Sequence, residues 1–303
     1  EGYSTEDSEM TISGDDVRIT SYGSGDKPWI YYNGPRDMSA IFRTTRSAVN
    51  TTIENLIIDS RFKGPDANRT KMPHAIKPEG NLNTIRNITF LNVGYGINAN
   101  SEPTGLMVQD NDAPTDYGLR GYLLWAQGKD IVVLGNKVVN STHEHPMRFW
   151  EVERVNVAYN DLDNPSVHSF ETLKTAFNFQ AGKYAYIYGN TFRGPRLQIG
   201  PLGGGDGGNY AYQRTQFVVF EANHTLDTQI EVEHGAENVV IRNNVLSNYN
   251  TSAIDIDGFD SEYNRGVVNL SIINNTVLNT GTSGRMIQLN GNASGIDVVN
   301  NLY

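Results

Sequence analysis

The stretch Ile131-Val132-Val133-Leu134-Gly135-Asn136 is an apolar run that closes on asparagine, and the chain repeats it. Further full copies close on Asn160, Asn190, Asn244, Asn275 and Asn301, and a degenerate copy closes on Asn223. The full copies are 24, 30, 54, 31 and 26 residues apart, which is typical of a solenoid. Asparagine at a corner can take a left-handed backbone, and its amide can form a ladder between coils. The repeat therefore predicts a parallel β-helix.

Composition and charge narrow the class of protein. The 303 residues include no cysteine, which excludes disulfides, thiolate nucleophiles and cysteine-bound zinc. A net charge of −10 argues against a nucleic-acid partner, since phosphate binding needs a basic surface. No apolar stretch is long enough to span a membrane, so we expect no membrane insertion. A disulfide-free chain of this length is expected to be a bacterial secreted or periplasmic protein, and a monomer.

The alternation of side chains along each strand predicts which residues face outward. Placing large apolar residues inside buries Leu123 and Trp125 and turns Tyr122 and Leu124 outward. The same rule turns these side chains outward on later coils: Arg148, Lys174, Asn178, Gln180, Arg196, Gln198, Glu231, Glu233, Asp255 and Asp257. Since coils stack at about 4.8 Å, these residues are expected to form one face that begins basic and ends acidic.

The segment Thr142–Trp150 combines two histidines, a carboxylate and an arginine. His143 and His145 are two residues apart, a spacing that allows a metal pair on one side of a strand. Histidine also titrates near neutral pH, which suits acid–base work. A solvated polar turn is the third interpretation of this segment.

Three stretches carry a resemblance to a known group of enzymes: His145-Pro-Met-Arg148-Phe-Trp, Leu173-Lys174-Thr-Ala-Phe-Asn178 and Gln198-Ile-Gly-Pro201. They resemble secreted bacterial right-handed β-helix proteins allied to polysaccharide lyases, namely alginate lyases of families 31 and 6, and more distantly mannuronan C5-epimerases. The resemblance extends over residues 80–303 in architecture and is specific over 120–202. It implies a uronic-acid polymer as substrate and removal of its C5 proton. Family-6 enzymes place a lysine and an arginine on neighbouring coils, and here Arg148 comes first and Lys174 second.

The residues also meet the chemical demands of that reaction. As the C5 proton leaves, a cation or a neutral hydrogen-bond donor must offset the charge of the adjacent carboxylate, and Arg148 and Arg196 can do so as cations. Lys174 can act as the base if cationic neighbours lower its pKa, and His145 can act without such help. Tyr122 can donate a proton to the leaving O4. The predicted catalytic residues are therefore Lys174, Arg148, His145 and Tyr122.

The expected site lies on coils within residues 120–235 of one right-handed β-helical domain, all-β, with about ten coils over residues 1–303. Its predicted substrate-binding residues are Arg196, Asn178, Gln180, Gln198, His143, Arg120, Glu231, Lys71 and His74. The basic run from Lys63 to Lys77 is expected to extend the cleft. No cofactor or metal is required, although Asp255 and Asp257, with Asp260, could hold calcium.

Two alternatives to the lyase remain open at this point. The outward carboxylates Glu231, Glu233, Asp255 and Asp257 suit a glycoside hydrolase, whose paired carboxyl groups lie about 5 to 9 Å apart. A non-catalytic carbohydrate-binding solenoid would instead use exposed aromatic side chains, for which the candidates are Trp150, Tyr184, Tyr210 and Tyr212. Within the preferred hypothesis, an acidic uronate polymer is the partner, and elimination and epimerisation begin with the same step.

Overall fold

The structure is a computed structural model, and it divides into two compact units, Glu1–Met147 and Arg148–Tyr303. It describes residues 3–5 (backbone only), 9–32, 40–60, 73–114, 121–139, 141, 144–164, 175–201, 214–247, 252–258, 266–278 and 284–303. These residues form strands, turns and bends, and no helix among them could cross a membrane. Each unit is described by itself, and the single domain over 1–303 stays a prediction.

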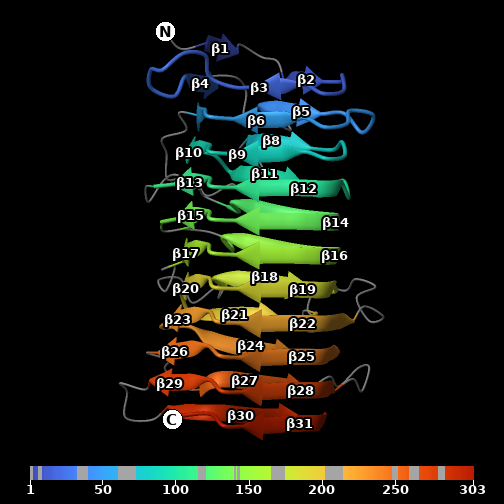
Figure 1. The fold of residues 1–303 in the computed structure, drawn as a ribbon, viewed down its shortest axis with the longest axis vertical. Helices are drawn as coiled ribbons and strands as arrows, with labels where there is room; N and C mark the ends of the chain where they lie inside the picture. The colour runs from blue at the N-terminus through green and yellow to red at the C-terminus, as the bar shows by residue number, and fades with distance from the viewer. Residues whose placement is uncertain are drawn as a thin grey trace. The chain divides into compact units, whose positions relative to one another are not determined.

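Unit 1, Glu1–Met147, is made of three stacks of parallel strands (Figure 1). Stack A contains β1 (Tyr3–Thr5), β4 (Trp29–Tyr32), β7 (Ile57–Asp59), β10 (Thr89–Leu91), β13 (Asp112–Ala113) and β15 (Lys137–Val138). Stack B contains β2 (Met10–Ile12), β5 (Phe42–Thr44), β8 (His74–Pro78) and β11 (Tyr95–Ala99). Stack C contains β3 (Arg18–Ile19), β6 (Thr52–Glu54), β9 (Thr84–Arg86) and β12 (Thr104–Gln109). The long strand β14 (Leu124–Leu134) begins in stack B and ends in stack C.

Unit 2, Arg148–Tyr303, repeats this arrangement. Stack A contains β17 (Asp161–Asp163), β20 (Thr191–Arg193), β23 (His224–Leu226), β26 (Val245–Ser247) and β29 (Thr276–Leu278). Stack B contains β18 (Phe177–Gln180), β21 (Arg196–Ile199), β24 (Gln229–Glu233), β27 (Ser252–Gly258) and β30 (Arg285–Gly291). Stack C contains β16 (Met147–Ala158), which pairs in this stack through Glu153–Ala158, and β19 (Lys183–Tyr188), β22 (Thr215–Glu221), β25 (Ala236–Arg242), β28 (Val267–Ile273) and β31 (Ala293–Val299).

Along the chain, a strand of stack B is followed by a strand of stack C and then by one of stack A. Each strand pairs with the strand of the same stack on the next coil. This connectivity is that of a right-handed parallel β-helix, as predicted. Each strand finds its hydrogen-bond partners one coil before and one coil after it, so the strand backbone is satisfied without helices. The repeated apolar phrase of the sequence forms the strands of stack C.

An asparagine ladder runs along the corner that follows stack C in unit 2. The side chain of Asn160 donates to Asn190 Oδ1 at 2.9 Å, and that of Asn190 donates to Asn223 Oδ1 at 2.9 Å. The degenerate copy at Asn223 therefore belongs to the ladder. The predicted left-handed backbone falls one position earlier, at residues such as Tyr159 (φ 59°) and Gly189 (φ 63°). The expectation that one asparagine would do both jobs was wrong, because a corner divides them between two consecutive residues.

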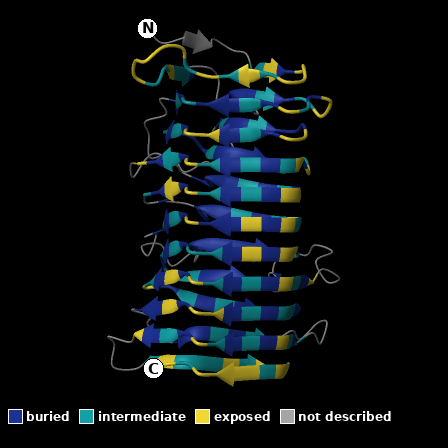
Figure 2. Cartoon of the chain, in the orientation of Figure 1, coloured by how far each residue is buried: buried dark blue, intermediate teal, exposed yellow. Residues whose placement is uncertain are grey.

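Aromatic side chains fill the interior of unit 2. Phe149, Phe177, Phe192 and Phe220 are buried, and successive rings lie 5.5, 5.5 and 5.7 Å apart. The alternation of buried and exposed residues along the strands is visible in Figure 2. Burying a phenylalanine stabilises the fold by roughly 2 kcal/mol, so these four rings contribute much of the packing energy between neighbouring coils.

One predicted side-chain orientation was wrong. Leu124 and Ala126 are fully buried and pair with the buried Ile97 and Ala99, whereas Trp125 pairs with Asn98 on the opposite side of the strand. The sequence rule had put Trp125 inside and Leu124 outside. A bend precedes Leu124, where β14 begins, so the alternation does not continue from Leu123 into the strand.

Candidate active site

The best-formed cluster of chemically useful side chains lies on stack B of unit 2, on the opposite side of the strands from the buried apolar residues. The register aligns Asn178 with Gln198, Gln198 with Glu231, and Glu231 with Asp255. Their sequence neighbours Phe179, Ile199, Val232 and Ile256 are buried. The outward placement predicted for β18, β21, β24 and β27 is therefore confirmed.

Two amides and a carboxyl group form a hydrogen-bonded chain across these strands. Asn178 Nδ2 donates to Gln198 Oε1 at 2.6 Å, and Gln198 Nε2 donates to Glu233 Oε1 at 2.6 Å. All three side chains are almost completely buried, although they lie on the outward side. Buried polar groups must be paired to avoid a desolvation cost, so this chain holds the three side chains in fixed positions.

Arg148 lies in β16 and reaches the same cluster. Its Nη2 atom donates to Gln180 Oε1 at 3.1 Å, and its guanidinium lies 5.6 Å from the ring centre of Trp150. Gln180 is buried, and its Nε2 atom has no hydrogen-bond partner in the described part of the chain. Asn178 Oδ1 is buried and lacks a partner there as well. The cluster thus offers a ligand one cation, Arg148, one hydrogen-bond donor without a partner among the described residues, Gln180 Nε2, and one such acceptor, Asn178 Oδ1.

The carboxyl groups beyond this cluster have altered acidity. Arg196 Nη1 pairs with Glu231 Oε2 at 2.7 Å. Burial raises the pKa of Glu231 above its usual value; Arg196 opposes the rise, and Asp255 and Asp257 add to it. Burial, together with the negative charge of Glu231, raises the pKa of Glu233 to about 8. Because the coils bring these acids together in a buried place, the protonated forms of Glu231, Glu233 and Asp255 are favoured relative to those of free carboxyl groups.

The sequence reasoning missed two side chains that extend this row. Asn290 Nδ2 donates to Asp255 Oδ1 at 3.0 Å, and Gln288 Nε2 donates to Asn290 Oδ1 at 3.2 Å. Burial raises the pKa of Asp255, Asp257 adds to the rise, and the hydrogen bond from Asn290 opposes it. The signal was present, since Gln288 and Asn290 alternate with the apolar Ile287 and Leu289.

Tyr122 and His145 belong to unit 1, where they lie in an aromatic cluster. The Tyr122 ring stacks on Tyr95 at 5.1 Å and lies 5.8 Å from His145. The Tyr122 hydroxyl donates to Glu144 Oε2 at 3.1 Å. Tyr122 is 4% exposed and His145 is 6% exposed. Tyr122 was expected on an open face, but neighbouring rings cover it; Tyr95 and Glu144 were not predicted.

His74 is a half-buried member of the same unit. Its ring lies edge-on to Tyr95 at 4.4 Å, and Asn98 Nδ2 donates to its Nδ1 atom at 2.9 Å. Burial, together with the positive charge of Lys77, lowers the pKa of His74 to about 4. His74 is therefore neutral at physiological pH and would offer a substrate hydrogen bonds rather than charge.

The depressed pKa of His74 predicts a loss of stability in mild acid. The unfolded chain takes up a proton as pH falls below 6.5, whereas the folded chain does so only near 4. Stability is therefore complete above 6.5 and falls between 6.5 and 4. At pH 5 the loss is about 2 kcal/mol. Urea unfolding at pH 7 and pH 5 measures it, and in His74→Gln this difference should largely disappear. An equal difference in both proteins would contradict the assignment.

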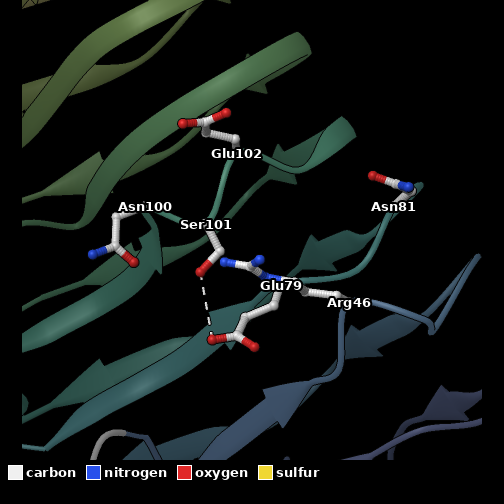
Figure 3. A pocket seen from close by; sticks show the side chains of 6 residues that line it. All are labelled: Arg46, Glu79, Asn81, Asn100, Ser101 and Glu102. Atoms are coloured by element: carbon white, nitrogen blue, oxygen red, sulfur yellow. Dashed lines mark hydrogen bonds between the residues drawn. The ribbon is translucent and has the colours of Figure 1, made fainter.

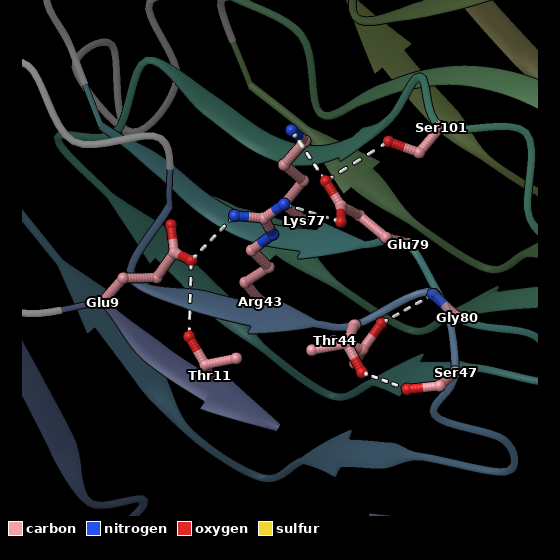
Figure 4. A network of polar contacts seen from close by, with 10 residues as sticks. Glu9, Thr11, Arg43, Thr44, Ser47, Lys77, Glu79, Gly80 and Ser101 are labelled. Atoms are coloured by element: carbon pink, nitrogen blue, oxygen red, sulfur yellow. Dashed lines mark hydrogen bonds and ion pairs between the residues drawn. The ribbon is translucent and has the colours of Figure 1, made fainter. Parts of the chain in front are cut away.

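The described end of the predicted basic run is not a free cationic surface. Lys77 Nζ pairs with Glu79 Oε1 at 2.9 Å, and Arg43 Nη2 pairs with Glu79 Oε2 at 2.8 Å (Figure 4). Arg43 also contacts Glu9 at 3.4 Å. Burial alone would raise the pKa of Glu79, but its bonds with Lys77 and Arg43 lower it. The cations here are occupied by carboxylates.

A separate pocket of about 400 Å³ opens beside this network in unit 1. Figure 3 shows its lining residues, which are Arg46, Glu79, Asn81, Asn100, Ser101 and Glu102. Ser101 Oγ donates to Glu79 Oε1 at 3.4 Å. The pocket is polar, and none of the predicted site residues lines it.

Several predicted residues lie outside the described part of the chain: Lys174, His143, Arg120, Lys71, Tyr210 and Tyr212. Of the other aromatic candidates, Tyr184 is 51% exposed and Trp150 is half-buried. Asp260, the third member of the calcium hypothesis, also lies outside it. Within the described ranges no three histidine or acidic side chains are grouped to hold a metal ion.

Comparisons with known proteins agree on the fold. No protein-family model and no curated protein sequence matches the chain. Among solved structures, it is similar to DFA-IIIase from Arthrobacter chlorophenolicus A6, with a TM-score of 0.64 and 9% identity over 98% of this chain and 81% of that one. The periplasmic alginate epimerase AlgG gives 0.53 and 10% over 91% and 78%. The Dettilon tailspike protein gp208 gives 0.60 and 13% over 98% of this chain, which spans only 61% of the tailspike. At such identities the likeness concerns the β-helix alone.

Proposed function

We propose that the chain is a carbohydrate-active β-helix that cleaves an acidic uronate polymer by β-elimination. The observation that carries the proposal is the cluster of Arg148, Gln180 and Asn178. A permanent cation lies there beside two buried amides, each with one open hydrogen-bonding atom. Such a set suits a ligand that combines a carboxylate with hydroxyl groups.

The reaction places defined demands on these residues. A base removes the C5 proton, the electron pair forms the C4–C5 double bond, and the C4–O bond breaks as the leaving oxygen takes a proton. Arg148 and Gln180 would hold the substrate carboxylate and offset its growing charge as the proton leaves. Lys174 or His145 would be the base, and Tyr122 or the other basic group would be the acid, as predicted from the sequence. Arg196 would bind substrate if it can leave Glu231.

The fold likeness supports the proposal at a general level. AlgG is named an alginate epimerase, and epimerisation of a uronate begins with the same proton removal. A polymer-cleaving enzyme of this kind is expected to act outside the cytoplasm, in agreement with the secreted or periplasmic location predicted from the sequence. We expect a monomer that needs no cofactor, with calcium at Asp255 and Asp257 as a further proposal.

The test is to incubate the protein separately with alginate, polygalacturonate, glucuronan and hyaluronan. We expect one of these polymers to yield ultraviolet absorbance from the new C4–C5 double bond. Absence of that absorbance with all four would count against the proposal. If cleavage occurs, unchanged activity in Lys174→Ala would remove Lys174 from the role of base.

A second candidate function, glycoside hydrolysis, is favoured by one observation. Burial raises the pKa of Glu233 to about 8, while Glu231, which lies on the same strand as Glu233, is paired with Arg196 of β21. Two carboxyl groups with different protonation states are what an acid and a base or nucleophile require. New reducing ends without ultraviolet absorbance, lost in Glu231→Gln, would favour the hydrolase over the lyase.

A further inference from the structure

The amide chain from Asn178 to Glu233 has a direction. An ionised carboxylate only accepts hydrogen bonds. Gln198 must therefore turn its Nε2 atom toward Glu233 and its Oε1 atom toward Asn178, as observed at 2.6 Å in both contacts. Asn178 in turn donates through Nδ2, which leaves Oδ1 as the open end of the chain. This acceptor is buried and unpaired among the described residues.

With the chain in this direction, its open end does not match the carboxylate of the proposed ligand. A substrate carboxylate brings only acceptor atoms. Arg148 and Gln180 Nε2 can donate to it, but Asn178 Oδ1 would repel it and remain unsatisfied. Two of the three groups in the cluster are thus suited to a carboxylate, and the third is not.

A proton on Glu233 allows the chain to reverse, because a protonated carboxyl group can donate a hydrogen bond as well as accept one. The protonated carboxyl donates to Gln198 Oε1, Gln198 Nε2 then donates to Asn178 Oδ1, and Asn178 Nδ2 becomes the open end. Each amide only exchanges the positions of its oxygen and nitrogen by a half-turn about its last bond. Two hydrogen bonds are kept, the orphaned acceptor gains a partner, and the cluster becomes three donors side by side.

The surroundings of Glu233 make this proton available. The charged groups that influence it are Glu231 on its own strand, Asp257 on β27 and Arg196 on β21, and Gln198 is its hydrogen-bond partner. Burial raises the pKa of Glu233 to about 8; Glu231 and Asp257 raise it, and Arg196 lowers it. The carboxyl group of Glu233 therefore keeps its proton to a higher pH than the carboxyl group of a free glutamate.

We infer that Glu233 is a positioning residue, which by holding a proton turns the Asn178 amide N–H toward the site and so completes a carboxylate-binding subsite with Arg148 and Gln180. The inference rests on the proposed function, since it takes a uronate as the ligand. Binding of the uronate and protonation of Glu233 are coupled. Protonation raises the affinity for the uronate by the same factor by which the bound uronate raises the affinity of Glu233 for its proton. Affinity for a uronate should therefore fall as pH rises above about 8, by up to tenfold per pH unit.

The experiment is calorimetric binding of short uronate oligosaccharides, prepared by partial acid hydrolysis of the polymer, between pH 6 and 9.5. For the wild-type protein we expect a fall in affinity above pH 8, with uptake of close to one proton seen by comparing buffers of different ionisation enthalpy. Glu233→Gln keeps a neutral group that can donate to Gln198, so it should lose both the fall and the uptake. The same oligosaccharides with their carboxyl groups reduced to alcohols are the control ligand and should show no fall.

Wild-type binding that stays constant to pH 9.5, or an unchanged fall in Glu233→Gln, would overturn the inference. The number of protons that the wild-type protein takes up on binding the oligosaccharide tests the role of Glu233 even if the variant folds poorly. Failure of the proposed function would look different, because the oligosaccharides would bind while the polymer gave no unsaturated product. Absence of binding at every pH would overturn the inference as well.

Discussion

Replacing Arg148 with alanine should lower the rate of polymer cleavage by about 10²–10³-fold, mainly in kcat. Arg148 is the cation that the structure joins to Gln180, beside the buried amide of Asn178. Its removal leaves no permanent charge at this point to offset the carboxylate as the C5 proton leaves. Steady-state kinetics on the polymer identified as the substrate would measure the loss. Arg148→Lys should restore little, because an ammonium group lacks the planar fork.

The matched control for this prediction is Arg242→Ala. Arg242 pairs with Glu221 at 2.7 Å on stack C of the same unit, away from the amide chain. Its removal should change kcat by less than about twofold, since an exposed ion pair contributes little to stability. If both arginine variants lose activity equally, or if Arg148→Ala keeps it, Arg148 does not act on the substrate.

Asn190→Ala should lower the free energy of unfolding by about 3 kcal/mol or more. The Asn190 side chain donates to Val157 O and to Asn223 Oδ1, and it accepts from the backbone N–H and the side chain of Asn160. Alanine would leave several of these buried groups unpaired, and the interior of a coil has no water to replace them. Urea unfolding followed by circular dichroism would report the change in midpoint.

Asn301→Ala is the control for the ladder. Asn301 is the last member, is only half-buried, and accepts from Asn275 at 2.9 Å. Solvent can pair with what this substitution exposes, so a cost of about 1 kcal/mol is expected. A cost for Asn190→Ala no larger than that for Asn301→Ala would show that the ladder is not a source of stability.

Much of the fold could be predicted because a solenoid repeats one local pattern. The closing asparagines identify the coils, and alternation places Phe177, Leu197 and Ile230 inside. It failed at Leu124 and Trp125, where a bend resets the alternation before the strand begins. It also assigned the left-handed backbone to the ladder asparagine, because a repeat shows which corner is special but not which of two adjacent residues turns it.

The candidate site could be predicted only as a row of neighbours. Register aligns Gln198 with Glu231, yet its amide bonds diagonally to Glu233, since a long side chain reaches beyond its in-register partner. The direction of the amide chain depends on this diagonal contact, and so does the identification of Glu233 as a positioning residue. The alternation of side chains also does not predict how far an outward side chain is exposed. Asn178 faces outward and is nevertheless fully buried.

The central claim is that the polymer is cleaved by elimination, and the mass of the products tests it most directly. The polymer that is cleaved would be digested in water labelled with heavy oxygen, and the oligosaccharides weighed by mass spectrometry. Elimination adds no water, so we predict products that carry a double bond, contain no labelled oxygen and have masses that add up to the mass of the uncleaved chain. Products heavier by one labelled water for each bond broken would contradict the claim and establish hydrolysis instead.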